Sequence, residues 1–247
     1  MCKDCGCSVS GWHTHADGTS HSHTHSHPTL NDSKTIDVIT KILSVNDEQA
    51  LKNRAELEKR KILGINLMSS PGAGKTTLLE ATIKGGKFKI GVVEGDLETN
   101  ADADRIAKAG APAFQISTGQ TCHLDAFMVN HGILHIPLDT LELLFVENVG
   151  NLVCPASYDI GTHINVVLLS VPEGDDKVAK YPVMFKNANL VVVTKATLLE
   201  HFEFDIDKVK REARKLNPNV DVIVLDSKSG EGLDAWFSFL EFKRKAL

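Results

Sequence analysis

The segment ILGINLMSSPGAGKTTLLE, residues 62–80, decides the fold of this 247-residue chain. Its first seven residues form an apolar run typical of a buried strand, and the residues after Lys75 have the pattern of a helix. Between them, SSPGAGKTT (69–77) matches the phosphate-binding pattern G-x-x-x-x-G-K-[ST], with Ser69 in place of the first glycine. Strand, loop and helix follow in the order that a P-loop requires, so the segment predicts a nucleoside triphosphate site.

Two side chains of this loop are expected to contact the nucleotide. Lys75 can reach the β- and γ-phosphates, and Thr76 can place its hydroxyl on Mg²⁺, while glycines let backbone amides turn towards phosphate oxygens. The predicted phosphate-binding residues are Gly72, Ala73, Gly74, Lys75, Thr76 and Thr77.

The rest of the chain alternates strand and helix patterns. Expected strands are 62–68, 89–95, 113–117, 141–147, 164–171, 190–194 and 220–226. Expected helices are 76–84, 101–109, 123–131, 176–187, 205–216 and 231–245. Several strands are continuous Val, Ile and Leu runs, typical of strands that are covered on both faces. The sequence therefore predicts an α/β fold with a doubly wound, mostly parallel sheet and ligand sites at the carboxyl ends of its strands.

Three segments are expected along the chain. Residues 1–33 are rich in Cys, His, Ser and Thr, and they hold too little apolar surface to offset the entropy of ordering, which predicts a disordered metal-binding tail. Residues 34–61 have helical spacing and predict a helical extension, with a second helix capped by Asn46 or Asp47. Residues 62–247 form the P-loop domain.

Composition excludes several classes of protein. Hydrophobic residues make up 42% and charged residues 24%, which suits a globular protein, and the net charge of -5 gives no case for nucleic acid or an anionic membrane as partner. Apolar runs stay far below the ~20 residues that span a bilayer. The N-terminus lacks the apolar core of a secretory signal, so a cytoplasmic protein is expected.

Acidic residues at strand ends are expected to complete a Mg²⁺ site. Asp96 ends the strand 89–95 in EGDLET, and Glu147 ends the strand 141–147 in FVENVGN. The motif E-N-V-G resembles the D-x-x-G switch of nucleotide hydrolases and places Gly150 near the γ-phosphate. Asp102 and Asp104 are nearby acidic alternatives, although an exposed helix face explains them better. The predicted catalytic residues are Lys75, Asp96 and Glu147.

The base-reading signal is weaker than the phosphate signal. GTPases commonly read guanine with N-K-x-D, and here the strand 190–194 runs into Thr194-Lys195-Ala196-Thr197. Lys195 fits the pattern, but Thr197 occupies the aspartate position, and a neutral hydroxyl replaces only part of what a carboxylate accepts. Ser227 and Lys228, in DSKSGEG (226–232), are expected to cover the base, although an ordinary loop before a helix explains this segment equally well.

Cysteines and histidines predict two metal sites. The first is the tail, where Cys2, Cys5 and Cys7 bring three thiolates within reach of one cation and six nearby histidines add imidazoles suited to Ni²⁺, Zn²⁺ or Cu²⁺. An expression tag or a neutral low-complexity segment is the alternative. The second site combines Cys154 with the pair Cys122-His123, which is expected to start a helix. A two-fold dimer would supply further ligands to that site.

The chain resembles the HypB family of hydrogenase nickel-incorporation GTPases. The motifs that carry the resemblance are MCKDCGC, NLMSSPGAGKTTLLE, EGDLET, TGQTCHLDA, LLFVENVGNLVCPA, VVVTKATLL and DSKSGEGL. It implies a GTPase of the signal-recognition-particle and MinD class that forms a nucleotide-dependent homodimer, partners the nickel metallochaperone HypA, and delivers Ni²⁺ to the precursor of the [NiFe]-hydrogenase large subunit. Carried over onto this chain, it implies Thr76, Asp96 and Glu147 at Mg²⁺, and metal sites at Cys122, His123 and Cys154 and at Cys2, Cys5 and Cys7. Thr197 departs from the family pattern, in which aspartate reads guanine.

Two other functions remain open at this point. The P-loop also suits an ATP-dependent kinase or synthetase of small molecules, which leaves the Cys and His residues unexplained. The tail alone would suit a nickel storage protein in which the nucleotide is incidental.

Overall fold

The computed structural model describes residues 12–14, 20–22, 33–96, 101–119 and 121–247, with side chains from residue 40 onward. Contacts divide the chain into two compact units, residues 1–45 and 46–247. In the first unit, the strands β1 (Trp12–Thr14) and β2 (Ser20–Ser22) pair antiparallel. A hairpin of this length is marginal in isolation. The rest of the predicted tail, including Cys2, Cys5 and Cys7, lies outside the described residues.

The second unit is built on a seven-stranded sheet in the order β5-β4-β6-β3-β7-β8-β9, and every pairing in it is parallel. The strands are β3 (Leu63–Ser69), β4 (Ile90–Asp96), β5 (Ala113–Ser117), β6 (Leu143–Glu147), β7 (Ile164–Ser170), β8 (Leu190–Thr194) and β9 (Asp221–Val224). All seven expected strands are present. The chain leaves β3 towards β4 and β5 and later returns to place β6 beside β3, so the order reverses next to the P-loop, where ligands bind in such sheets.

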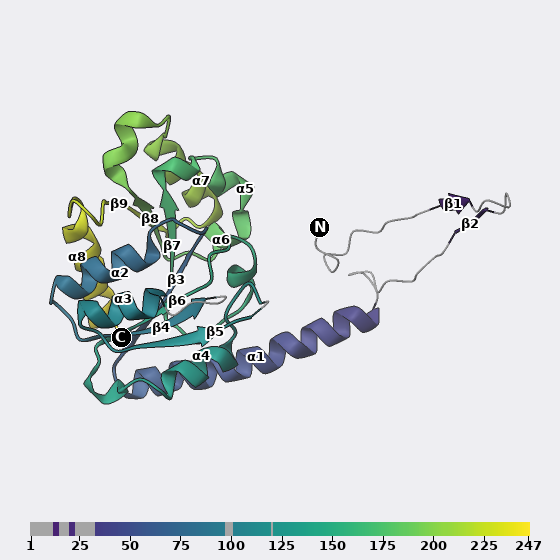
Figure 1. Ribbon diagram of the computed structural model, residues 1–247, viewed down its shortest axis with the longest axis horizontal. Coiled ribbons are helices and arrows are strands. Elements are labelled where there is room, and N and C mark those ends of the chain that lie inside the picture. Colours follow the sequence, from purple (N-terminus) through teal and green to yellow (C-terminus); the bar gives the residue numbers. More distant parts are fainter. Residues whose placement is uncertain (1–11, 15–19, 23–32, 97–100, 120) are drawn as a thin grey trace. The chain divides into compact units, whose positions relative to one another are not determined.

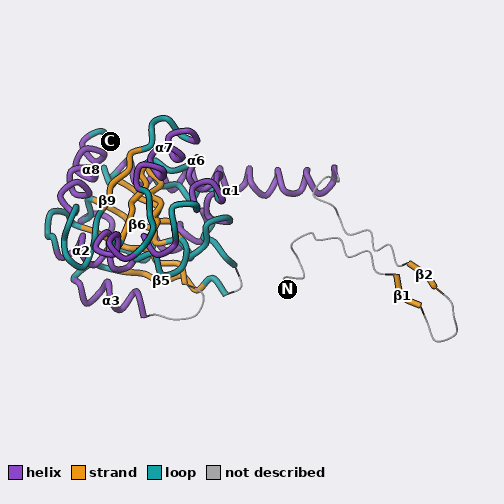
Figure 2. The backbone as a smooth tube through the Cα atoms, turned by 90° about the horizontal axis from the view of Figure 1, so that it is seen from above, coloured by secondary structure: helices purple, strands orange, loops and turns teal. Residues whose placement is uncertain are grey.

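Helices cover both faces of the sheet (Figure 1). They are α1 (Ser33–Lys59), α2 (Lys75–Lys84), α3 (Ala101–Ala109), α4 (Ala126–Ile133), α5 (Lys177–Lys180), α6 (Pro182–Lys186), α7 (Ile206–Leu216) and α8 (Leu233–Lys245). On one face of the sheet, residues of α2, α3 and α8 pack against the strands and form one hydrophobic core. The opposite face packs against residues of α1 and α4 at one end and of α5, α6 and α7 at the other. Figure 2 shows the strands of this unit enclosed by these helices.

Two expectations about the helical extension are wrong. The structure has one continuous helix, α1, because Asn46 faces the fold rather than capping: its side chain donates to the Asp159 carbonyl at 2.8 Å and accepts from the Ala126 amide at 2.9 Å. Asn53 and Leu57 are buried in the same unit as the sheet. The expected boundary at residue 62 therefore moves to residue 46.

Two expected helices have different bounds. The helix expected over 123–131 begins at Ala126, because Asp125 accepts a hydrogen bond from the Met128 amide and caps it. Cys122 and His123 thus precede the helix and do not start it. The helix expected over 176–187 is divided into α5 and α6 at Tyr181, since Pro182 disfavours helical geometry in the residue before it. Among the helices that the structure describes, none is long and apolar enough to cross a membrane.

Candidate functional site

The loop between β3 and α2 has the shape of an anion cradle. Gly72 and Gly74 adopt φ values of +75° and +100°, in the left-handed region that side chains disfavour, and the loop opens directly into α2. Lys75 is only 8% exposed, and its ammonium donates to the Ser69 hydroxyl at 3.1 Å. Ser69, which breaks the usual glycine pattern, therefore holds the lysine inside the loop.

A cavity of about 390 Å³ lies in front of this loop. Thr76 donates to a Glu147 carboxylate oxygen at 2.9 Å, so the start of α2 is joined to the end of β6. The structure brings most of the predicted nucleotide residues to this cavity, which is lined by Gly72, Gly74, Lys75, Thr76, Thr77, Asp96, Glu147 and Gly150. Of the two acidic alternatives, Asp102 lines it, and it also pairs with Arg105 at 2.7 Å.

Sequence reasoning missed Glu94, a second buried carboxyl group in this cavity. It is 2% exposed and stands directly across from Glu147 in the pairing of β4 with β6. Burial first, and then repulsion from Glu147, raises the pKa of Glu94 to about 8. Burial also raises the pKa of Glu147 to about 7, against the opposing effects of Lys75 and Thr76. A charged residue inside an otherwise apolar strand was the available signal.

Each of these glutamates keeps one oxygen, Oε2, that has no hydrogen-bond partner among the described residues. Buried polar atoms of this kind are uncommon, because an unsatisfied group costs ~1–3 kcal/mol. Glu147, the Thr76 hydroxyl and the Asp96 carboxylate line one cavity and form an oxygen donor set of the type that Mg²⁺ prefers. The residues therefore fit a hard divalent cation beside the phosphate loop.

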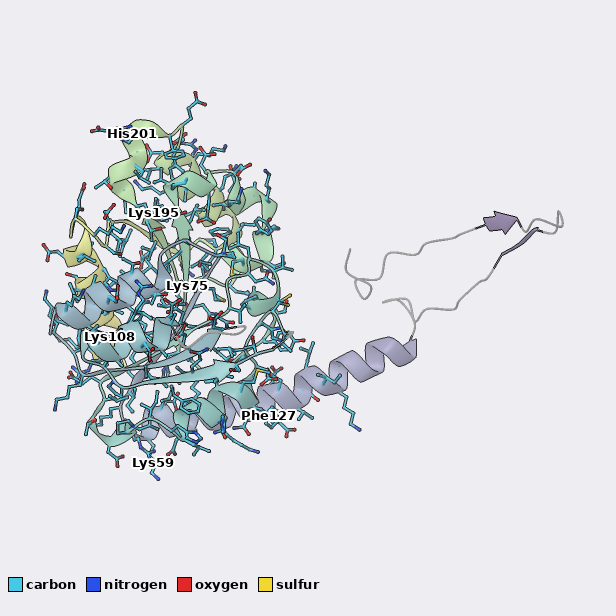
Figure 3. The ribbon with its side chains drawn as sticks, viewed as in Figure 1. Lys59, Lys75, Lys108, Phe127, Lys195 and His201 are labelled. Carbon is cyan, nitrogen blue, oxygen red and sulfur yellow. The ribbon has the colours of Figure 1, made fainter. Side chains whose placement is uncertain are left out.

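A second cavity, of about 330 Å³, lies beside the first and shares Gly74 and Thr77 with it. Thr194, at the end of β8, donates to the Ala73 carbonyl at 2.7 Å and so ties the phosphate loop to the segment with Lys195. In Figure 3, Lys75 and Lys195 both lie in the sheet-containing unit. The predicted base-contacting residues Lys195, Ser227 and Lys228 line this second cavity, together with Ala73.

The adjacent residues Cys122 and His123 come together with Cys154, which lies about thirty residues further along the chain. One ligand atom from each lies within 4.8 Å of the others. The His123 ring stacks on Tyr158 with centroids 4.0 Å apart, and burial lowers its pKa, which favours the neutral imidazole that binds metals. A hydrogen bond with Cys122, and burial, raise the pKa of the Cys154 thiol.

The segment from Glu147 to Cys154 contacts both the phosphate loop and this Cys/His group. A methyl group added at Gly150 would lie 2.9 Å from the Pro71 Cα, so the segment lies directly against the loop. Asn148, which lines the phosphate cavity, accepts a hydrogen bond at 3.1 Å from the backbone amide of Leu124, the residue after His123. The two sites are thus physically connected.

Comparison with known proteins gives a consistent result. The family described as the CobW/HypB/UreG nucleotide-binding domain matches residues 63–224. A hydrogenase/urease maturation factor HypB from Helicobacter hepaticus is 45% identical over 222 residues, which cover 88% of this chain and 91% of that protein. The hydrogenase maturation factor HypB of Escherichia coli (strain K12) is 45% identical over 234 residues, covering 94% of this chain and 79% of the relative. The chain belongs to the HypB family of hydrogenase maturation factors.

Solved HypB structures have the same fold. HypB from Helicobacter pylori, crystallised in complex with nickel, matches with a TM-score of 0.79 at 45% identity, over 81% of this chain and 95% of that one. HypB from Archaeoglobus fulgidus matches with a TM-score of 0.76 at 41% identity, over 82% and 100% of the two chains. The matched nucleotide-binding domain includes the phosphate loop, both buried glutamates and the Cys/His group, while Asp226 lies just beyond it.

Proposed function

We propose that this chain is a GTP-hydrolysing metallochaperone that binds nickel and delivers it to the precursor of the [NiFe]-hydrogenase large subunit. In this proposal it works as a homodimer and receives nickel with the help of the metallochaperone HypA. Membership of the HypB family supports the maturation role, and the nickel complex of the Helicobacter pylori relative supports the metal. The Cys/His group and the cavity beside the phosphate loop supply the chemistry.

The nucleotide would occupy both cavities, with its phosphates at the loop. Lys75 would leave the Ser69 hydroxyl for the β- and γ-phosphates, while the backbone amides after Gly72 would bind phosphate oxygens. Thr76, Asp96 and Glu147 would hold Mg²⁺, which would neutralise charge on the phosphates during hydrolysis. Glu94, buried and protonated at neutral pH, would be a proton-carrying group within the same cavity.

Nickel is cargo in this proposal rather than a resident cofactor. The thiols of Cys122 and Cys154 and the neutral imidazole of His123 would bind Ni²⁺ or Zn²⁺, with a ligand from the second copy of the chain completing the shell. Because thiols must lose their protons to bind, loading would release protons and weaken as pH falls. Cys2, Cys5 and Cys7 would form a separate nickel site in the tail.

The observation that carries the proposal is the shared segment between the two sites. Hydrolysis would remove the γ-phosphate beside Gly150, and any movement there would reach Cys154 along the backbone and Leu124 through the Asn148 side chain. A displacement of ~1 Å exceeds the ±0.2 Å tolerance of a metal–ligand distance, so it would weaken the binding of the ion. An ATP-dependent kinase or synthetase gives the Cys/His group no role, and a storage protein gives the cavities none.

Turnover of GTP and of ATP, measured with and without Ni²⁺ and with oligomeric state read in parallel, tests the proposal. It predicts GTP hydrolysis, together with an effect of Ni²⁺ on turnover or dimerisation. Phosphate transfer from ATP to a small molecule would support a kinase instead. Nickel binding with no hydrolysis of either nucleotide would support storage.

A further inference from the structure

The second cavity contains a carboxylate that the sequence pattern did not anticipate. Asp226 follows β9 and is 5% exposed, and its Oδ2 accepts a hydrogen bond at 2.6 Å from the hydroxyl of Thr197. Both residues line the cavity with Lys195. Thr197 stands where the N-K-x-D pattern has its aspartate, so the hydroxyl occupies the expected carboxylate position and a carboxylate occupies the loop beside it.

Asp226 is held as a fixed anion. Its Oδ1 accepts from the backbone amides of Lys228 at 2.8 Å and Ser229 at 3.1 Å, which pins the side chain at the rim of the cavity. Burial by itself would raise the pKa of Asp226, but the hydrogen bonds from Thr197, Ser229 and Lys228 outweigh it and hold the pKa below its usual range. The group is therefore ionised at neutral pH and accepts hydrogen bonds without donating any.

The direction of the Thr197 hydrogen bond decides what the pair offers to a ligand. A threonine hydroxyl has one proton, and this proton is directed at Asp226. The lone pairs of Thr197 and the remaining lone pair of Asp226 Oδ2 then present acceptors alone. Guanine carries two adjacent donors on one edge, N1–H and the N2 amino group, whereas adenine has an acceptor at N1 and a C–H at C2.

We infer that Thr197 and Asp226 together read the N1–H and N2 amino edge of guanine, with Asp226 supplying the carboxylate that the N-K-x-D pattern would place at position 197. This inference rests on the proposed nucleotide function and adds the residues that set its base specificity. It replaces the sequence-based expectation of weak guanine selection, because a hydroxyl bonded to an anion is a stronger acceptor than a free one.

Equilibrium dissociation constants of the Mg²⁺ complexes of GDP, ADP and XDP test the pair. The wild-type chain should prefer GDP over ADP. Asp226→Asn preserves the shape of the side chain and the oxygen that accepts from the Lys228 and Ser229 amides. It replaces Oδ2, an acceptor, with an amide nitrogen that donates. GDP affinity should therefore fall ~10- to 100-fold, the range for one hydrogen bond to a charged group, while XDP, which has a carbonyl at C2, gains relative to GDP.

An exchange variant separates base reading from simple loss of stability. Asp226→Ser should lose the preference for GDP, and adding Thr197→Asp to it should restore that preference by returning the carboxylate to the N-K-x-D position. Thr197→Asp alone would set two carboxylates against each other and should weaken GDP. Asp234 is exposed and lies outside the cavity, so Asp234→Asn, which removes the same negative charge, should leave all three affinities unchanged. Thermal unfolding confirms that each variant is folded.

The outcomes distinguish this inference from the function on which it rests. Binding of neither GDP nor ADP by the wild-type chain would refute the nucleotide function and the inference with it. Equal binding of both nucleotides would leave the nucleotide function standing and refute guanine reading. A preference for GDP that survives in Asp226→Asn and in Asp226→Ser would also overturn the inference, because other groups would then read the base.

Discussion

Replacing Glu94 with glutamine should change how the stability of the nucleotide-free protein depends on pH. The pKa of Glu94 is raised from 4.5 to about 8 by burial and by Glu147 across the sheet. Between these two values the unfolded chain loses the proton that the folded chain retains, so the folded state binds more protons and its stability falls as pH rises. Below pH 4.5 both states are protonated, and above pH 8 the full penalty is present.

The size of the effect follows from the two pKa values. At about 1.4 kcal/mol for each pKa unit, this carboxyl group costs ~1 kcal/mol at pH 5 and ~4 kcal/mol at pH 8. Glutamine does not ionise, so Glu94→Gln should gain ~3 kcal/mol relative to the wild type between pH 5 and pH 8. Glu147, whose pKa is about 7, also makes stability fall as pH rises, over a narrower pH range. It does so in the wild type and in Glu94→Gln alike.

Urea unfolding at pH 5, 6.5 and 8, without Mg²⁺ or nucleotide, measures this difference. Glu200→Gln, an exposed change of the same kind, is the matched control and should differ from the wild type by less than about 0.5 kcal/mol at each pH. Wild-type and Glu94→Gln stabilities that run parallel across this range would refute the reasoning, because Glu94 would then ionise as it does in the unfolded chain.

Three further predictions concern the sites. Lys75→Ala should leave the fold intact and strongly reduce nucleotide binding or turnover, and wild-type hydrolysis by a folded variant would show that the phosphates bind elsewhere. Deleting residues 1–33 should lower nickel stoichiometry, measured by equilibrium dialysis, while GTP hydrolysis persists; complete loss of hydrolysis in a folded product would show that the tail and the domain depend on each other. Gly150→Ala should push the Glu147–Cys154 segment away from Pro71 and reduce hydrolysis, whereas the same substitution at Gly86, where a methyl group meets nothing within 4 Å, should cost some stability and leave hydrolysis unchanged.

The elements that local pattern determines could be predicted from the sequence. The strands could be predicted because continuous apolar runs are typical of a sheet covered on both faces. The order of β3, loop and α2 could be predicted because the glycine, lysine and threonine of a phosphate loop have a fixed spacing. Helix bounds were less accurate where a tertiary contact competed with a local signal. Asparagine is a common helix N-cap, but the side chain of Asn46 instead forms hydrogen bonds with the backbone amide of Ala126 and the carbonyl of Asp159.

The site could be predicted in part. Thr76, Glu147 and Gly150 each belong to a short motif that singles them out as candidates, and the fold brings them to one cavity. Asp226 was missed because its partner, Thr197, is 29 residues away and only the pairing of β8 with β9 brings the two loops together. Glu94 carries one local signal, a charge inside an apolar strand, but its pairing with Glu147 across the sheet is a tertiary contact that the local pattern does not report.

The most direct test of the account is the nickel affinity of the Cys/His group in two nucleotide states. A full-length chain with Cys2, Cys5 and Cys7 changed to serine leaves Cys122 and Cys154 as its only cysteines, so thiolate-to-nickel charge-transfer absorption reports this site alone. Nickel is titrated with GDP and with a non-hydrolysable GTP analogue, and Cys154→Ala in the same background is the control. The account predicts affinities that differ by a coupling free energy of ~1–3 kcal/mol, and a matching effect of nickel on nucleotide affinity, both absent from the control. Equal nickel affinities in the two states would contradict nucleotide-controlled delivery.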